Sequence, residues 1–114
     1  MKIREVIEAA DNARPNTVDD RTKCKWLVNL NMEIAEMMEI TAPEFVYPDL
    51  EYELLMPAPY DEVYVAYLKA KIDYEMKETE DYANDYQEYN YMMADGRAWW
   101  RRHHVPQPVG AWRI

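Results

Sequence analysis

Hydrophobic residues recur at intervals of three and four along most of the chain, and this spacing predicts α-helices. The first such pattern covers residues 2–13. It should end just before Pro15, because proline disfavours helical geometry in the residue that precedes it. A second pattern runs from Cys24 to Met38 and predicts a helix over about residues 20–40.

The strongest helical pattern begins at Pro59, a residue type that is tolerated in the first turn of a helix. Its hydrophobic stripe consists of Tyr60, Val63, Tyr64, Tyr67, Leu68, Ile72 and Met76. The opposite side is also apolar, at Ala66 and Ala70, so we expect a central helix that is covered on more than one side. A fourth helix is predicted from about Asn84 to residues 101–104, with Tyr86, Tyr89, Met93 and Trp100 on its apolar stripe.

Residues 43–58 interrupt the helical pattern, because several prolines exclude a continuous helix there. Within this segment Leu50, Tyr52 and Leu54 alternate with acidic residues, which is typical of a short half-exposed strand or extended arm. A lone strand needs a partner, either residues 45–47 in a hairpin or a strand of another copy. The second option makes Leu50, Tyr52 and Leu54 an arm between subunits.

Together these segments predict a mainly α protein, a small bundle of about four helices with one short extended or β arm. A length of 114 residues fits a single domain, which we place at residues 1–104. Residues 105–114 are predicted to form an extended C-terminal tail. The presence of only two glycines disfavours a turn-rich all-β fold, and ten tyrosines and eight methionines suit contact surfaces.

The charge of the chain is unevenly distributed. The net charge is −9, and the segments 1–25, 26–96 and 97–114 carry +1, −14 and +4. An acidic body repels polyanions, which argues against nucleic-acid binding by the whole surface, since contacts to phosphates supply most non-specific affinity. The basic C-terminal end is the exception.

Candidate chemistry is sparse. The chain lacks a nucleophile paired with a base, a Gly-rich phosphate loop and an HExxH pattern. His103 and His104 are neighbours on a predicted helix, so they point in different directions and suit capping of the helix end better than a shared metal. Cys24 lies on an apolar stripe and is interpreted as an inert core residue. We therefore expect no enzyme activity, no cofactor and no metal site.

The environment of the protein is also indicated by the sequence. One cysteine cannot form an intrachain disulfide, and the N-terminus has no signal-peptide pattern, so a reducing compartment is expected. No apolar run approaches the roughly 20 residues that a membrane-spanning helix needs. We expect a soluble protein without a membrane partner.

The segment from Trp99 to His104 stands out, because two adjacent tryptophans cannot occupy one face of a helix. Trp100 fits the apolar stripe and is predicted to be core, which leaves Trp99 partly exposed beside positive charge. Tryptophan and arginine dominate binding hot spots. The predicted partner-binding residues are Trp99, Arg101, Arg102, Trp112 and Arg113. Packing of the tail on its own chain and contact with nucleic acid or a membrane surface are the alternatives.

Two motifs are the most distinctive parts of the chain: a proline–tyrosine–acid entry into the third predicted helix and an aromatic-basic end of the fourth. They read Pro57-Ala58-Pro59-Tyr60-Asp61-Glu62 and Trp99-Trp100-Arg101-Arg102-His103. With the N-terminal helix that ends at Arg14-Pro15-Asn16, the chain resembles, over roughly residues 1–106, the small head-tail connector (adaptor or head-completion) proteins of tailed phages and prophages.

The resemblance implies a structural virion protein that forms a ring, dodecameric in that family, beneath the portal protein. The ring would join the portal to the next tail or neck component, of the stopper or tail-terminator type, and DNA would pass through without specific binding. Location in the virion neck, and in the host cytoplasm during assembly, follows from the same resemblance. It further implies that the C-terminal segment docks on the portal.

The acidic centre of the chain leaves one alternative function open. A charge of −14 over residues 26–96 also suits an acidic regulator or DNA mimic that binds and blocks a DNA-binding enzyme. The tyrosine-rich apolar stripe between the acidic residues and the arginines at the C-terminal end favour the connector interpretation.

Overall fold

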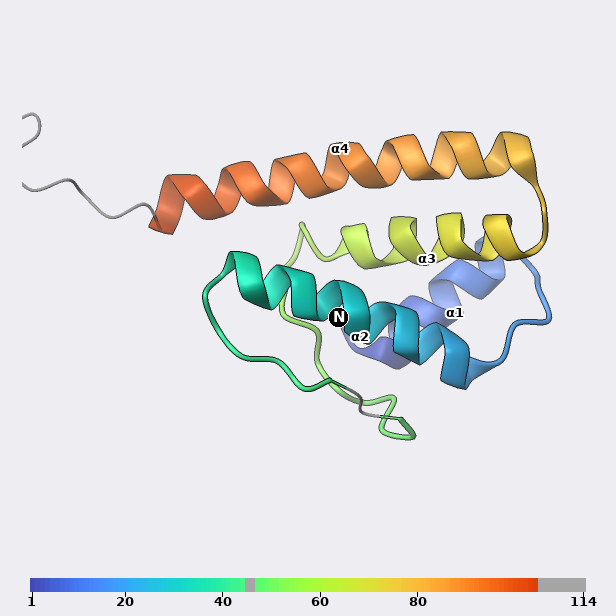
Figure 1. The fold of residues 1–114 in the computed structure, drawn as a ribbon, viewed down its shortest axis with the longest axis horizontal. Coiled ribbons are helices and arrows are strands. Elements are labelled where there is room, and N and C mark those ends of the chain that lie inside the picture. Colours follow the sequence, from blue (N-terminus) through green and yellow to red (C-terminus); the bar gives the residue numbers. More distant parts are fainter. Residues whose placement is uncertain (45–46, 105–114) are drawn as a thin grey trace, which may run out of the picture.

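The computed structural model describes residues 1–44 and 47–104. Within these ranges the chain forms four helices, α1 (Ile3–Ala13), α2 (Asp20–Met37), α3 (Glu62–Glu75) and α4 (Thr79–His104). Figure 1 shows α3 and α4 as an antiparallel pair, with α1 and α2 beneath α3. The helix α3 packs against every other helix, whereas α4 packs chiefly on α3. The predicted mainly α bundle of about four helices is confirmed.

The central position of α3 follows from its two apolar sides. Leu68 and Ile72 on the predicted stripe are buried, and so are Ala66 and Ala70 on the opposite side. The N-terminal helix behaves as its pattern predicts, since its buried residues are Ile3, Val6, Ile7 and Ala10. Burial of these stripes joins α1, α2 and α3 into one hydrophobic core.

Two helix ends use a left-handed residue that is not glycine. Glu39 (φ 58°) follows α2, and Lys77 (φ 59°) follows α3. In each case the next amide reaches back into the helix, with Ile40 N donating to Ala35 O (2.9 Å) and Glu78 N donating to Asp73 O (2.9 Å). These bonds satisfy carbonyls at the helix ends and turn the chain sharply, so α4 folds back along α3.

The observed ends of three helices differ from the predicted ones. The turn at Glu39 ends α2 at Met37, before the predicted residue 40. Pro59 lies in a turn before α3, because the amides of Tyr60 and Asp61 both donate to the carbonyl of Pro57. The helix α4 begins at Thr79 rather than near Asn84, since the acidic side chains of its first turn suit the positive end of the helix dipole.

Candidate interaction surfaces

The predicted arm is held by its own chain. Its backbone pairs with the N-terminus through Ile3 N to Tyr52 O (3.1 Å), Arg4 N to Leu50 O (2.8 Å) and Leu54 N to Met1 O (3.0 Å). Only one isolated antiparallel bridge forms in the described residues, between Lys2 and Glu53. These groups of the arm therefore pair with residues 1–4, whereas residues 45–46 of the hairpin mate predicted at residues 45–47 lie outside the described residues.

The three residues predicted to form an arm between subunits have a place in their own chain. The side chain of Leu54 is only 4% exposed and belongs to the core of its own chain. Leu50 and Tyr52 are half-buried and pack against that core. Alternation of apolar and acidic residues describes the segment correctly, and its apolar side packs on the core of its own chain.

A buried polar network fixes the end of the arm. The Tyr64 hydroxyl donates to Asn31 Oδ1 (2.8 Å) and accepts from Met56 N (3.0 Å). Asn31 Oδ1 also accepts from Leu55 N (3.0 Å). One α2 side chain and one α3 side chain thus satisfy two consecutive amides of a segment without helical hydrogen bonds. Burial raises the pKa of Tyr64, so its hydroxyl remains a donor at all ordinary pH values.

The C-terminal end of α4 carries the predicted partner-binding residues. Trp99 is half-buried and stacks on Tyr60, with ring centroids 5.1 Å apart. Trp100 is also half-buried, and its ring lies 3.4 Å from that of His104. The expectation of a core Trp100 is wrong, because its ring is only half-buried. The expected partial exposure of Trp99 agrees with its half-buried ring, one contact of which is the stack on Tyr60.

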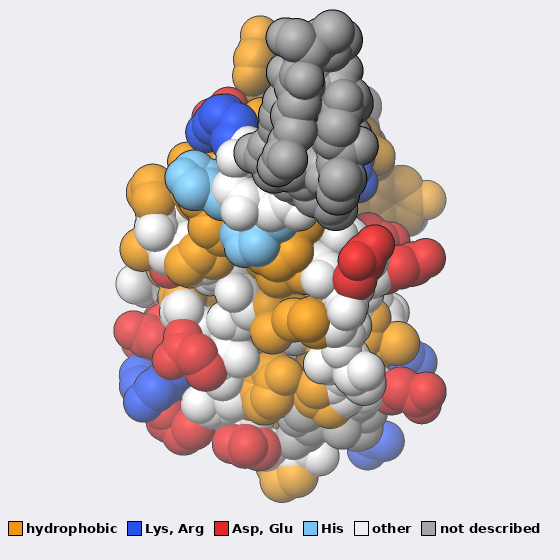
Figure 2. Space-filling model, turned by 90° about the vertical axis from the view of Figure 1, so that its left-hand side faces the viewer, with side chains coloured by type: hydrophobic (Ala, Val, Ile, Leu, Met, Phe, Trp, Pro, Cys, Tyr) orange, Lys and Arg blue, Asp and Glu red, His pale blue; other side chains and the backbone are white. Residues whose placement is uncertain are grey.

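The two histidines close the last turn of α4. Nδ1 of His103 lies 3.0 Å from the Trp99 carbonyl oxygen, and Nδ1 of His104 lies 3.0 Å from the Trp100 carbonyl oxygen. Each ring thus donates to the carbonyl four residues earlier, which lies within the helix and is not one of the free carbonyls at its end, so the predicted capping role is not what this contact provides. Figure 2 shows this end of the molecule, with hydrophobic side chains down its middle and acidic side chains on both flanks.

The structure describes only some of the other predicted partner-binding residues. Arg101 and Arg102 are exposed on the last turn of α4. Trp112 and Arg113 lie in the tail, outside the described residues. The structure therefore brings Trp99, Arg101 and Arg102 to one end of one helix.

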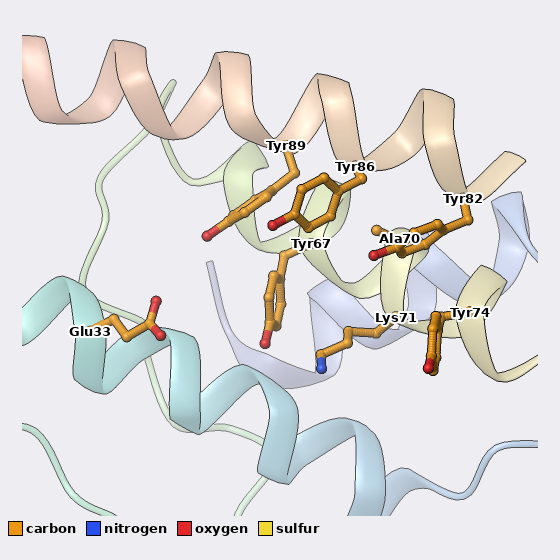
Figure 3. A pocket seen from close by; sticks show the side chains of 8 residues that line it. All are labelled: Glu33, Tyr67, Ala70, Lys71, Tyr74, Tyr82, Tyr86 and Tyr89. Atoms are coloured by element: carbon orange, nitrogen blue, oxygen red, sulfur yellow. The ribbon is translucent and has the colours of Figure 1, made fainter.

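A groove lined by tyrosines runs between α4, α3 and α2 (Figure 3). The tyrosine groove consists of Tyr67, Tyr74, Tyr82, Tyr86 and Tyr89, with Glu33, Ala70 and Lys71 at its edges. Its volume is about 510 Å³. The five rings form a continuous run from Tyr67 through Tyr89, Tyr86 and Tyr82 to Tyr74, and consecutive centroids are 5.2, 5.9, 5.6 and 5.5 Å apart. Such spacing is typical of favourable aromatic pairs.

Charged side chains frame the groove. The Lys71 ammonium lies 5.7 Å from the ring centroids of both Trp26 and Tyr67, within range of cation–π attraction. Burial raises the pKa of Tyr67 to about 12, with a smaller contribution from the Glu33 carboxylate, so the hydroxyl stays protonated. The groove therefore offers flat apolar rings with hydrogen-bonding tips.

Sequence reasoning missed the groove, because it placed Tyr67, Tyr86 and Tyr89 on core stripes. Tyr86 is 44% exposed and Tyr74 is 65% exposed. The side of α4 that faces α2 is left open, since α4 packs chiefly on α3. The excess of tyrosine was the available indication, because a polar tip makes this residue a poor choice for an interior without partners.

An ionic cluster of Arg14, Lys69, Asp73 and Asp85 lies where the end of α1 meets α3 and α4. Arg14 Nε lies 3.1 Å from Asp73 Oδ1 and 3.1 Å from Asp85 Oδ2, and Lys69 Nζ lies 3.7 Å from Asp85 Oδ1. Asp73 is 1% exposed, and its second oxygen has no hydrogen-bond partner among the described residues. Burial and the nearby Asp85 carboxylate raise the pKa of Asp73 to about 7, against the opposing effect of Arg14.

These carboxylates do not form a metal site in the described part of the chain. Across residues 1–44 and 47–104, no group of three or more His, Cys, Asp or Glu side chains is arranged to hold a metal ion. Cys24 is buried, and burial raises the pKa of its thiol, which lowers its reactivity. None of the described helices is long and apolar enough to cross a membrane.

Comparison with known proteins does not assign the chain to a family. No family model matches it, and neither a curated protein nor a solved structure shows significant similarity to it.

Proposed function

We propose that this protein is a structural subunit of a phage head-tail connector, which forms a ring between the portal protein and the next tail or neck component. The observation that carries the proposal is the contrast between the end of α4 and the rest of the surface. Arg101 and Arg102 are exposed next to two half-buried tryptophans, whereas the central segment 26–96 carries a charge of −14. One end of the molecule thus combines the residue types that dominate binding hot spots.

The acidic body suits the passage of DNA. Exposed carboxylates such as Glu80 and Glu88 lie along α4, and Asp95 follows on the same helix. A ring lined by such side chains would repel phosphates, so a duplex could slide through without being held. The connector subunit would act through its surfaces, with the portal at the basic end of α4 and other copies at its sides.

The experiment that tests the proposal measures binding to a portal protein from the same phage or prophage. Arg101→Glu together with Arg102→Glu should abolish co-purification with the portal while the fold is retained, because both side chains are exposed. Lys25→Glu together with Lys77→Glu is the matched control, since it makes the same change of net charge at exposed positions elsewhere. Wild-type protein that never binds the portal and never forms a ring, as measured by mass photometry, would refute the connector role.

The exposed carboxylates of α4 also favour a second candidate function. A protein that displays Glu80, Glu88 and Asp95 to solvent could mimic the charge of DNA and block a basic DNA-binding enzyme. Competition with DNA for such an enzyme, lost at high salt, would support this function over the connector.

A further inference from the structure

The tyrosine groove lies apart from the basic end of α4, because it lies along the first half of that helix and the basic residues lie on its last turn. We propose that the tyrosine groove of one copy binds the proline-containing segment 105–109 of a second copy. This inference deepens the proposed function and rests on it only for the ring, since it names the contact that would join neighbouring subunits.

The chemistry of the groove matches an extended proline-containing segment. Residues 105–109 read Val-Pro-Gln-Pro-Val. Such sequences favour the polyproline II conformation, whose backbone carbonyls make no internal hydrogen bonds and which docks on surfaces lined by aromatic rings. Flat tyrosine rings pack on proline rings, and tyrosine hydroxyls can donate to the free carbonyls. In Figure 3 the rings of Tyr82, Tyr86 and Tyr89 lie beneath α4 along one side of the groove, and Tyr67 points from α3 toward α2.

The spacing of the rings is also suitable. One turn of a polyproline II helix contains three residues and advances about 9 Å. Consecutive tyrosine centroids are 5.2 to 5.9 Å apart, so each turn of the ligand spans nearly two ring intervals. A five-residue segment therefore covers most of the run.

The length of the chain excludes the segment's own groove as its binding site. Tyr86 lies 18 residues before His104 on one helix, a distance of about 27 Å. Pro108 lies only four residues after His104, and four extended residues reach at most about 14 Å. The prolines can therefore reach the groove of another copy but not that of their own chain.

The contact would be head-to-tail, because the segment and the groove are different surfaces of the same chain. A repeated head-to-tail contact closes into a ring when the rotation between copies permits it, and otherwise it continues into a filament. Trp112 and Arg113 lie beyond the docked segment in the sequence and remain available to the portal. One tail could thus serve two contacts.

A peptide-binding experiment tests the proposal without any portal. The probe is a fluorescent peptide of residues 104–114. The receptor is the full chain with Pro106→Ala and Pro108→Ala, which keeps the groove but removes the two prolines through which its own tail would compete with the peptide. Fluorescence anisotropy should show saturable binding. Adding Tyr82→Ala and Tyr86→Ala to the receptor should weaken binding by about tenfold or more, because two central aromatic contacts are lost.

The matched control is Tyr91→Ala in the same receptor. Tyr91 is 73% exposed on α4 and does not line the groove, so its removal should leave the affinity unchanged. A peptide in which both prolines are alanine should bind weakly to every receptor. The proposal is overturned if the intact receptor does not bind the peptide, or if Tyr91→Ala weakens binding as much as the groove substitutions.

Mixing two full-length variants tests the head-to-tail contact itself. The groove variant (Tyr82→Ala, Tyr86→Ala) has an intact tail, and the tail variant (Pro106→Ala, Pro108→Ala) has an intact groove. Chemical cross-linking should yield a dimer from the mixture and only monomers from each variant alone. Cross-linking of either variant alone to the same extent as wild type would refute the contact. If the chain binds the peptide but not the portal, the connector role is refuted and the groove contact still holds. If the chain binds the portal but not the peptide, the groove contact is refuted and the connector role still holds.

Discussion

Substitution of Tyr64 by phenylalanine tests whether the arm is held by the buried polar network. The change removes one hydroxyl and leaves the rest of the ring in place. The amide of Met56 then loses its partner in the interior, which costs about 1 to 3 kcal/mol. Asn31 Oδ1 loses one of two hydrogen bonds, which adds about 0.5 to 1.5 kcal/mol, while the cheaper desolvation of phenylalanine offsets part of the sum.

We expect Tyr64→Phe to lower the free energy of unfolding by about 2 to 3 kcal/mol, a large share of the 5 to 15 kcal/mol typical of a domain. Urea unfolding followed by far-UV circular dichroism measures the change. The control is Tyr91→Phe, which removes an exposed hydroxyl and should shift the free energy of unfolding by less than about 0.5 kcal/mol. Equal stability of the two variants would refute the reasoning and would mean that the arm is held by apolar contacts alone.

Three further substitutions address other parts of the fold. Lys77→Gly should raise the free energy of unfolding by about 1 kcal/mol, seen as a higher Tm, because φ is 59° there and glycine adopts that geometry without strain. Trp99→Ala should lower the free energy of unfolding by about 2 kcal/mol in urea unfolding, because the stack on Tyr60 is lost, so this tryptophan cannot serve as a silent surface probe. The pKa of Asp73 is raised from 3.8 to about 7, so the folded state holds a proton that the unfolded state releases. The free energy of unfolding should therefore fall as the pH rises from about 4 to about 7, whereas Asp73→Asn should lack this pH-dependent component.

Much of the fold was predictable because the apolar residues recur along the chain at the period of an α-helix. The spacing of Ile3, Val6, Ile7 and Ala10 leaves one side of α1 for the core, and all four are buried. Hydrophobic burial is roughly proportional to area and needs no particular partner, so a pattern along the chain is enough to identify the buried side. The two-sided coverage of α3 was predictable for the same reason.

Buried polar residues were not predicted, because their burial depends on partners that are distant in the sequence. Asn31 continues the stripe of Leu27 and Ile34 at helical spacing, and Asp73 continues the stripe of Ala66 and Ala70. Their position on the buried side of each helix could be predicted from the sequence. Whether a polar residue there is buried depends on a hydrogen-bonding or ionic partner that the sequence pattern does not identify. Asp73 meets Arg14 across 59 positions of sequence, and no local pattern encodes that pairing.

The backbone pairing of the arm was also not predicted, because its partner is distant in the sequence. Alternation of Leu50, Tyr52 and Leu54 predicted an extended segment that needs a partner. The partner proved to be residues 1–4, which carry no strand pattern, because α1 begins at Ile3 and leaves its first amides without helical acceptors. Carbonyls of the arm accept from those amides. The start of a helix thus supplied donors that a search for a second strand could not find.

The two groups of tyrosines differ in a way that bears on assembly. Tyr64 has its hydroxyl satisfied inside the core, whereas Tyr74 and Tyr86 remain largely exposed in the groove. A surface that stays covered from synthesis onward tends to be apolar, like the interior of a domain. A surface that meets water before its partner arrives needs polar tips, which keep exposed rings soluble without removing their contact area. Tyrosine satisfies both requirements, and its concentration in the groove therefore favours a contact that forms after the subunit has folded.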